Sequence, residues 1–369
     1  MTVSDSTSNC SSKKLDEQQL TTLASNIKRW GLELGFDAVG ITDTELSSHE
    51  QHLDAWVEKG MHGDMDYMHK HGSKRSHPEQ LIEGTQRIIS VRMDYAPADI
   101  KQAEKVLFSK DVGYISRYAL GRDYHKVLRN RLKKLAEKIN QEIGNFGYRA
   151  FTDSAPVLEK DLAEKAGLGW IGKHSNLLDS KTGYWFFLGE LYVDLELPID
   201  QPASNHCGTC QRCIDICPTQ AIVGPYQVDA RLCVSYLTIE LKEAIPVELR
   251  SKIGNRIYGC DDCQFACPWN KFAQTTKEAD FSPRAQITDR KLIDLFNWSE
   301  KEFLSNTEGS AIRRIGYDSW LRNIAVAIGN STPSKELITT LEAKRENVSD
   351  MVKEHIDWAL GELKLKYTI

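Results

Sequence analysis

Eight of the nine cysteines lie within one short stretch of the chain, and their spacing constrains what that stretch can fold around. The first run is Cys207-x2-Cys210-x2-Cys213-x3-Cys217-Pro218. Bacterial ferredoxins use this spacing to hold [4Fe–4S] clusters. The second run, Cys260-x2-Cys263-x3-Cys267-Pro268, is one cysteine short because Ile257 stands at the first position. The free candidate to complete it is Cys233.

Eight thiolates satisfy two [4Fe–4S] clusters, so we predict that this stretch binds two. In the ferredoxin pattern the cysteine before proline binds the other cluster. That rule gives one set of Cys207, Cys210, Cys213 and Cys267, and another of Cys217, Cys233, Cys260 and Cys263. Disulfides are disfavoured in a reducing cytosol, and structural zinc sites usually show two separated C-x2-C pairs. The C-x3-C-x2-C triplet of radical SAM enzymes is absent, because Gln220 and Asn270 replace its third cysteine.

The remaining composition indicates a globular protein with two or three domains in its 369 residues. Hydrophobic residues make up 41% and charged residues 27%, which is ordinary for a folded chain. The net charge of -5 argues against a generally basic nucleic-acid coat, but a local basic patch is compatible with it. The most apolar window, 184–193, is broken by Glu190, so we expect no membrane span. The first residues lack the apolar segment of a secretory signal, and we expect a cytoplasmic protein.

Hydrophobic periodicity predicts an α+β multidomain chain. After a flexible tail at 1–17, helices at 17–35 and 123–143 and strands at 36–41, 87–93, 148–151 and 184–193 suggest an α/β catalytic domain over 18–199. The cysteines define a ferredoxin-like domain over 200–285. Helical pattern fills 286–369, where 320–329 resembles 352–361 at a period of 32 residues. Both segments end in glycine, which suits helix C-caps in stacked hairpins of the HEAT type.

Two motifs look like cofactor sites and are not taken as such. Gly167-Leu-Gly-Trp-Ile-Gly172 satisfies G-x-G-x-x-G, but 161–166 before it reads as a helix, whereas a dinucleotide site needs a strand there. We expect a tight glycine bend beside some larger cofactor. Asp123-Tyr-His125 begins like the D-x-H-x-x-G motif of cobalamin-binding proteins but continues into Leu128, so His125 is a poor candidate for a cobalt ligand.

Four further runs carry a family resemblance. Tyr114–His125, Thr152–Glu159, Ala166–His174 and Gly259–Gln264, together with the double-cluster cysteines, resemble the epoxyqueuosine reductases over nearly the whole chain after residue 17. The resemblance implies a cobalamin-dependent iron–sulfur enzyme related to reductive dehalogenases, with base-off cobalamin and no protein ligand below the cobalt. It implies the last step of queuosine synthesis, in which epoxyqueuosine at the wobble position of tRNA is reduced to queuosine. The reaction consumes two electrons and two protons, and the epoxide oxygen leaves as water.

The resemblance also implies roles for acidic residues. Asp153 matches the proton donor of the family, and it is included among the cofactor contacts. Desolvation beside an apolar corrin face would raise the pKa of this carboxyl, so that it holds a proton at neutral pH. The structural alternative for Asp153 is a helix N-cap. Asp123 is a second acid candidate, with the same alternative.

Further contacts are expected around the cofactor and the RNA. The cobalamin candidates are Arg75, Lys173, His174, Asn176, Ser235 and Asp261, each of which can equally be an ordinary turn or surface residue. The tRNA candidates are Arg313, Arg314 and Arg322 in the helical tail. Basic residues over 126–138 can contact RNA or form a solvated helix face. We expect a monomer served by a low-potential electron donor.

Two other functions compete at this point. The first is a dehalogenase-like enzyme acting on a small molecule, which would not need a helical tail with basic residues. The second is a non-catalytic electron carrier, which would not bind stoichiometric cobalamin.

Overall fold

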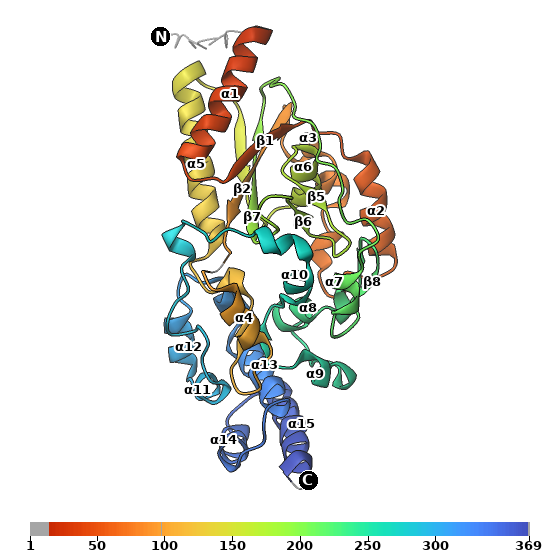
Figure 1. Cartoon of the computed structure of the whole chain (residues 1–369), viewed down its shortest axis with the longest axis vertical. Helices are drawn as coiled ribbons and strands as arrows, with labels where there is room; N and C mark the ends of the chain where they lie inside the picture. Colours follow the sequence, from red (N-terminus) through yellow and green to blue (C-terminus); the bar gives the residue numbers. More distant parts are fainter. Residues whose placement is uncertain (1–14, 97, 368–369) are drawn as a thin grey trace, which may run out of the picture.

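The computed structural model describes residues 15–96 and 98–367 (Figure 1). The predicted tail at 1–17 lies outside them, apart from its last three residues. The strands are β1 (Ala38–Thr42), β2 (Arg87–Asp94), β3 (Tyr114–Ile115), β4 (Tyr148–Phe151), β5 (Trp170–Ile171), β6 (Leu177–Leu178), β7 (Phe186–Val193), β8 (Ile222–Gly224), β9 (Gln227–Val228) and β10 (Arg256–Tyr258). The helices are α1 (Glu17–Glu33), α2 (Ser47–Glu58), α3 (Pro78–Leu81), α4 (Ile100–Leu107), α5 (Tyr124–Ile143), α6 (Glu159–Lys165), α7 (Arg212–Asp215), α8 (Val234–Ile239), α9 (Val247–Ile253), α10 (Asp262–Ala266), α11 (Leu292–Phe296), α12 (Glu300–Asn306), α13 (Tyr317–Gly329), α14 (Lys335–Arg345) and α15 (Asp350–Tyr367).

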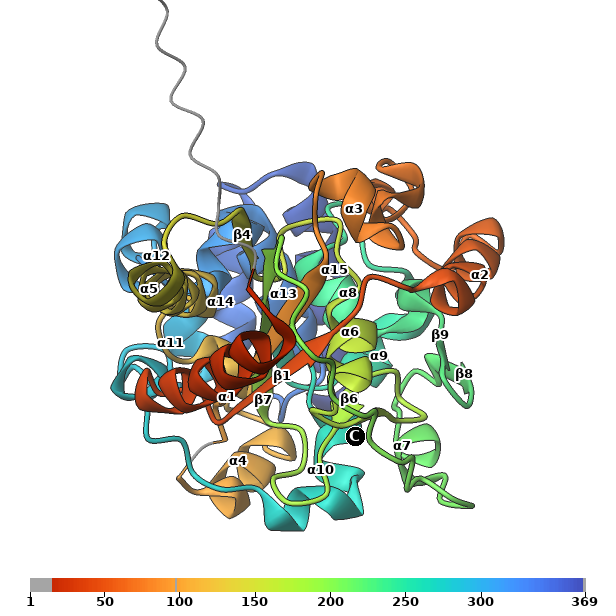
Figure 2. The ribbon, with the colours of Figure 1, turned by 90° about the horizontal axis from the view of Figure 1, so that it is seen from above.

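The central sheet has the order β1-β2-β7-β4, and each neighbouring pair is antiparallel. Helices α1 and α5 cover one face and α6 covers the other (Figure 2). Successive side chains of a strand point to opposite faces of the sheet, so both faces receive apolar residues. For example, Ile89 packs toward α1 and α5, whereas Ile88 packs toward α6. The expected helices and strands of this region are confirmed. The antiparallel sheet nevertheless differs from the parallel sheet of a typical α/β domain.

Helix α5 matters most for the site because its first turn carries functional residues. The Asp123 side chain accepts a hydrogen bond from the His125 amide and caps the helix. The predicted inward residues are all buried against the sheet, which fixes the rotation of the helix: Val127, Leu128, Leu132, Leu135 and Ile139. As a result, the first turn is presented at the end of β4, where Asp153 follows.

The glycine-rich motif follows α6 and leads into the hairpin of β5 and β6. A helix therefore precedes the glycines, as expected, and the strand–glycine–helix arrangement of a dinucleotide site is not formed. Gly169 has φ 156°, and a Cβ atom there would lie 2.1 Å from the Leu178 carbonyl oxygen. The close approach at this glycine is thus to the hairpin itself. Whether the rest of the bend approaches a cofactor stays a prediction.

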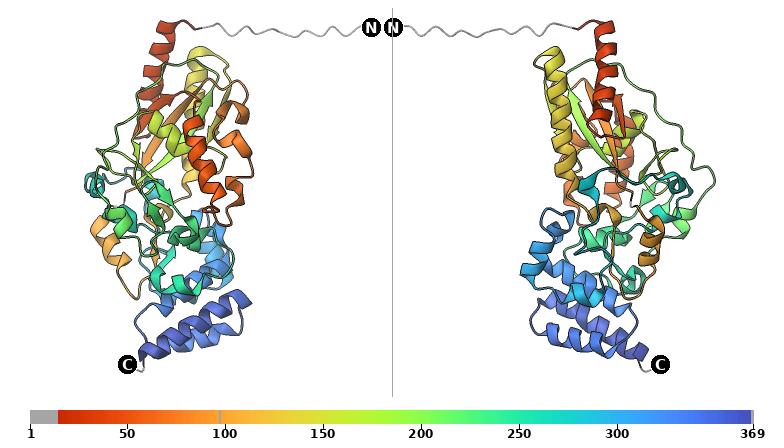
Figure 3. Two further views of the ribbon diagram at one scale, coloured as in Figure 1. Left: turned by 90° about the vertical axis from the view of Figure 1, so that its right-hand side faces the viewer. Right: turned by 60° about the vertical axis from the view of Figure 1, so that its left-hand side comes forward.

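The C-terminal helices lie at the end of the molecule opposite α1 (Figure 3). Their core is continuous with earlier segments, because Ile115, Ile257 and Trp320 belong to one buried cluster. Strand β3 also pairs in parallel with β10 across the predicted boundaries. The segments 18–199, 200–285 and 286–369 are therefore joined by shared packing.

The two resembling segments become α13 and α15, which pack against each other. The expectation of glycine C-caps is wrong, because Gly329 is the last residue inside α13 and Gly361 lies within α15. A Cβ atom at Gly329 would lie 2.5 Å from the Trp358 ring, so this glycine permits close helix packing. Among the described residues, none of the helices combines the length and the apolar character needed to cross a bilayer.

Candidate functional site

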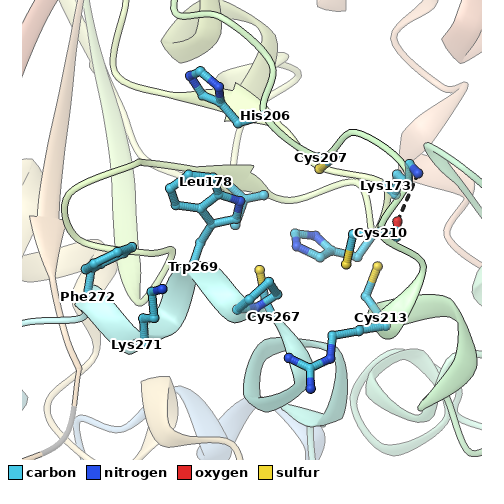
Figure 4. A pocket seen from close by; sticks show the side chains of 13 residues that line it. Lys173, Leu178, His206, Cys207, Cys210, Cys213, Cys267, Trp269, Lys271 and Phe272 are labelled. Carbon is cyan, nitrogen blue, oxygen red and sulfur yellow. Dashed lines mark hydrogen bonds between the residues drawn. The ribbon is translucent and has the colours of Figure 1, made fainter.

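One of the two predicted cysteine sets lines a single cavity of about 320 Å³ (Figure 4). Its members come from segments far apart in sequence, and their sulfur atoms face the same space: Cys207, Cys210, Cys213 and Cys267. Burial and the neighbouring thiols raise the pKa of Cys213, and burial raises that of Cys267 to about 11. A bound cation such as iron would compensate the charge of the Cys213 and Cys267 thiolates and so favour them.

The other predicted set also forms a neighbourhood. Cys233 is the residue before α8, and it interacts electrostatically with Cys217. Cys260 interacts with Cys263 and Cys233. Burial raises the pKa of Cys233, Cys260 and Cys263. Cys217, Cys233, Cys260 and Cys263 therefore lie close enough to influence one another, and the assignment of this set to one cluster stays a prediction.

An aromatic recess opens between the central sheet and α10. It is lined by residues from several elements, namely Tyr95, Tyr118, Tyr124, Lys160, Asn176, Leu177, Tyr184, Phe186, Phe187, Leu188 and Gln264. The Tyr184 hydroxyl has no hydrogen-bond partner among the described residues, but Tyr184 and Cys263 influence each other's pKa, which places the recess near the second cysteine set. The Gln264 side-chain oxygen is buried without a hydrogen-bond partner among the described residues. Apolar walls with a free amide oxygen suit a large flat ligand rimmed by amides.

Asp153 lies at one edge of this recess, and its carboxylate accepts two hydrogen bonds. The Tyr124 hydroxyl and the His125 Nε2 each lie 2.9 Å from Oδ2. The other ring nitrogen of His125, Nδ1, lies 2.6 Å from Asp123 Oδ1. His125 thus bridges the two acid candidates. The Asp153 side chain is 50% exposed, so it faces open space rather than the core.

In the hydrogen-bonded series Asp123–His125–Asp153, the proton resides on His125. Burial alone would lower the pKa of His125, but its hydrogen bonds with Asp123 and Asp153 outweigh burial and raise that pKa to about 9. Burial would raise the pKa of Asp153, but the bonds from His125 and Tyr124 lower it overall. The expected rise of the Asp153 pKa depends on an apolar corrin face beside the carboxyl and stays a prediction. Among the described residues, the cationic imidazole of His125 lowers this pKa.

The backbone of Asp153 is strained. Its φ of 55° lies in the left-handed region, where a residue other than glycine costs about 1–3 kcal/mol. Its amide donates a hydrogen bond to the Glu159 carboxylate at the start of α6. The alternative role as an N-cap is not adopted, since the residue before α6 is Leu158.

Several predicted cofactor contacts are engaged within the protein. Arg75 donates hydrogen bonds to the carbonyl oxygens of Tyr67 and Met68. Lys173 donates to the carbonyl oxygens of Gly208 and Cys210, and so ties the glycine bend to the first cysteine loop. Their charged groups therefore help to shape these loops, and their role as cobalamin contacts stays a prediction.

Asp261 is likewise committed. It accepts hydrogen bonds from the hydroxyls of Tyr114 and Ser116 and from the Arg117 amide, and it is 1% exposed. This carboxylate holds β3 against the second cysteine loop instead of facing a ligand.

The remaining cofactor candidates occupy three places. Asn176 lines the aromatic recess. His174 lines the cavity of the first cysteine set, and burial lowers its pKa to about 4, so it is neutral there. Ser235 is half-buried on α8, two residues after Cys233.

The predicted RNA contacts divide into two groups. The prediction that Arg322 contacts RNA is wrong, because its side chain is 0% exposed. Its guanidinium donates hydrogen bonds to the carbonyl oxygens of Leu237, Leu241 and Glu243. Arg313 and Arg314 are exposed, and Arg314 pairs with Glu240.

The positive charge of Arg314 also contributes to the lowered pKa of Asp153, so this arginine lies near the recess. A hydrogen bond of 2.8 Å from the Asp123 amide to the Gly309 carbonyl holds this segment against α5. Lys126 and Arg129 are exposed on the same end of α5.

Sequence reasoning missed three residues around Asp153. His125 was considered only as a cobalt ligand, Glu159 only as the end of a resembling run, and Glu190 only as a break in an apolar window. A charged residue in the middle of a buried strand was the available signal for Glu190, since such groups are rarely buried without a partner.

The cysteine sets and their buried surroundings are typical of an iron–sulfur protein. Residues 206–270 match the family described as a 4Fe-4S double cluster binding domain. Residues 75–154 match the family described as epoxyqueuosine reductase QueG, DUF1730. The epoxyqueuosine reductase of Pseudomonas aeruginosa is 59% identical over 92% of this chain and 94% of its own length. That of Escherichia coli K12 is 58% identical over 93% and 90%. The chain belongs to the epoxyqueuosine reductase family and is an oxidoreductase.

Solved structures agree with this assignment. The epoxyqueuosine reductase of Streptococcus thermophilus superposes with a TM-score of 0.84 at 30% identity, covering 93% of this chain and 90% of its own. That of Bacillus subtilis, solved with an aspartate catalytic loop swung out of the active site, has a TM-score of 0.83 at 26% identity over 93% and 90%. An epoxyqueuosine reductase with an epoxyqueuosine-modified tRNA-Tyr stem loop has a TM-score of 0.78 at 25% identity over 93% and 99%.

Proposed function

We propose that this reductase converts epoxyqueuosine to queuosine at the wobble position of tRNA, with two [4Fe–4S] clusters feeding electrons to cobalamin in the aromatic recess. The observation that carries the proposal is the position of this recess. One side meets the second cysteine set through Tyr184, and the other side meets Asp153 through Tyr124. Electrons and protons can therefore reach one ligand from separate directions.

For the clusters we propose the crossed ligand sets described above. The set with Cys217, Cys233, Cys260 and Cys263 adjoins the recess and would be the last electron carrier before it. The set with Cys207 shares its cavity with Phe272, which is 42% exposed, and would receive electrons from an external low-potential donor.

For cobalamin we propose base-off binding without a protein ligand below the cobalt. The residues of the recess fit the group, since tyrosine and phenylalanine rings form its walls and Asn176 and Gln264 offer side-chain amides. When bound, cobalamin would supply the low-potential centre that reduces the epoxide carbon. His125 is held between two carboxylates and is not available as a ligand.

For proton transfer we propose that Asp153 passes to the substrate a proton held on His125. The epoxide oxygen needs protons to leave as water, and a positioned side chain must supply each one. His125 carries a proton at neutral pH, and Asp153 Oδ2 connects it to the open side of the site. Asp123 stabilises the imidazolium from the far side. In the Bacillus subtilis relative a catalytic aspartate loop was seen outside the active site, and we infer that the loop of Asp153 moves in the same way.

The proton on His125 leads to a pH prediction. Single-turnover rates of the pre-reduced enzyme should fall as pH rises through about 9, because His125 is charged below its pKa and neutral above it. His125→Asn should lower the rate and remove the fall of the rate near pH 9. His52→Asn, an exposed histidine on α2, should keep the wild-type profile. A His125→Asn profile identical to wild type would contradict the assignment.

For tRNA we propose that Arg313, Arg314 and the exposed Lys126 and Arg129 form the contact surface at the mouth of the recess. The wobble base would leave its stack to enter the recess, as in other enzymes that act on a base. Segments 18–199 and 200–285 would then hold the cofactors, and the helices of 286–369, which we propose are HEAT-like, would support the RNA.

Removal of the two arginines should weaken RNA binding in a salt-dependent way. Each phosphate contact releases counterions, so Arg313→Ala with Arg314→Ala should raise the KM for tRNA and flatten its dependence on salt. Reduction of bound cobalamin should not change. Lys335→Ala, which removes an exposed charge from α14, is the matched control and should behave like wild type. Equal KM and equal salt slopes in the double variant and the control would refute the contact.

The function itself is tested with purified components. The anaerobically reconstituted protein, with cobalamin and a low-potential reductant, should convert epoxyqueuosine in tRNA to queuosine, as read from a nucleoside digest. Digests from cells lacking the protein should accumulate epoxyqueuosine. Conversion without cobalamin would remove the cobalamin part of the proposal. No observation favours the small-molecule dehalogenase or the electron carrier.

A further inference from the structure

Glu190 is a buried acid that the proposed proton route does not use. It lies in the middle of β7 with 0% exposure, opposite Ser90 of β2. One carboxyl oxygen lies 3.4 Å from the Ser90 hydroxyl. The other carboxyl oxygen has no hydrogen-bond donor among the described residues. After burial, the largest influence on the pKa of Glu190 comes from another carboxyl, that of Glu159.

Two adjoining carboxyl groups can form a hydrogen bond only when one of them carries a proton. Burial, and then the charge of Asp153, raise the pKa of Glu159 to about 7. Burial, and then the charge of Glu159, raise the pKa of Glu190 well above its ordinary value. Ionising both groups in the interior would leave two like charges close together, which one shared proton avoids.

The pair is connected directly to the strained residue of the site. The Glu159 carboxylate accepts the hydrogen bond of the Asp153 amide, and Asp153 has a φ of 55°. Nothing in its residue type forces this conformation, so the surrounding contacts must maintain it. Glu159 is the side chain that holds this amide.

We propose that Glu159 is a positioning residue that keeps Asp153 directed into the recess, and that Glu190 locks Glu159 in place by sharing a proton with it. The inference rests on the proposed role of Asp153. The Glu159–Glu190 pair would determine whether the loop of Asp153 is held in place or is free to move. Glu159 and Glu190 themselves do not touch the substrate.

The lock depends on pH. The groups that face the pair are His125 of α5, Asp153 after β4, Lys160 of α6 and Tyr192 of β7. Rising pH removes the shared proton, and the two carboxylates then repel each other, so the hold on Asp153 weakens. His125 and Lys160 oppose this by their positive charge, which makes the change gradual.

The test compares variants of Glu159 in the reconstituted holoenzyme. Glu159→Ala removes the acceptor, and turnover should fall about 10–100-fold with an unchanged Kd for tRNA, because the reacting group is misplaced. Hydrogen exchange of the peptide over residues 152–158 should become faster. Glu159→Gln keeps an acceptor oxygen and should restore most of the turnover and protection. Asp161→Asn, an acid on the same helix that pairs with His49, is the matched control and should change neither.

A second variant, Glu190→Gln, tests the proposal even if Glu159→Ala does not fold. In Glu190→Gln the amide donates to Glu159 without a titrating proton. Exchange of 152–158, corrected for intrinsic rates, should then stay constant between pH 7 and 9, whereas in the wild type it should rise. Wild-type exchange and turnover in Glu159→Ala, or equal pH dependence in Glu190→Gln and wild type, would overturn the lock. Full turnover of Asp153→Asn would instead refute the role of Asp153 and leave the exchange results standing.

Discussion

Asp153→Asn should lose on the order of 10²–10⁴-fold in turnover while retaining both clusters and cobalamin, since that is the usual contribution of a positioned proton-transfer group. The substitution preserves shape, and asparagine tolerates the left-handed backbone found at this position. It removes the carboxylate, and the amide oxygen that remains cannot take up the His125 proton and pass it on. The measurement is single-turnover conversion of epoxyqueuosine tRNA by pre-reduced protein, with iron content and the cobalamin spectrum recorded on the same sample.

The variant has a second expected signature. Asp153 is one of two carboxylates that raise the pKa of His125, so its neutralisation should lower that pKa from about 9. The alkaline limb of the residual activity should therefore move to lower pH. Near-normal turnover with an unshifted limb would remove Asp153 from the route and make Asp123, on the other side of His125, the next candidate.

The parts of this site that the sequence predicted are those encoded by local spacing. The cysteine runs specify two clusters because each run places its ligands on one tight loop. Helix α5 was predicted because its apolar residues recur at helical intervals, and the same rule places Asp123 at its start.

The missed parts depend on contacts between distant segments. His125 and Asp153 are 28 residues apart, and only the sheet brings the end of β4 to the first turn of α5. The pKa of Asp153 was expected to rise by desolvation, and it falls because an imidazolium that no local pattern announces lies 2.9 Å away. Electrostatics at this site follow from tertiary structure.

Arg322 is a residue for which the sequence predicted a functional contact that the tertiary structure does not allow. Three arginines in a helical tail suggested a basic surface, yet Arg322 lies among the buried residues of α13 and serves backbone carbonyls after α8. The apolar residues Leu321, Ile324 and Val326 lie on different sides of α13, which was a signal that this helix is buried all round. Arginine can satisfy several carbonyl groups at once, and this makes it suitable for such a junction.

Cys233→Ser should cost one cluster and leave the other. Wild-type protein reconstituted without oxygen should hold about eight iron atoms and the variant about four, following from two cubane clusters. The reason is geometric, since Cys233 stands with Cys217, Cys260 and Cys263 and apart from the cavity of the Cys207 set. The lost cluster would be the one that adjoins Tyr184 and the recess. Turnover should therefore fall to background even though the remaining cluster can still be reduced.

Cys10→Ser is the matched control for this variant. Cys10 belongs to neither run, so its substitution should leave iron content, spectra and turnover unchanged. Iron and sulfide analysis with electron paramagnetic resonance of the reduced proteins separates the outcomes. One cubane signal in Cys233→Ser and two in Cys10→Ser would support the crossed sets. Two unaltered signals in Cys233→Ser would show that another residue is the eighth ligand, and the electron route from this cluster to the recess would have to be redrawn from that residue.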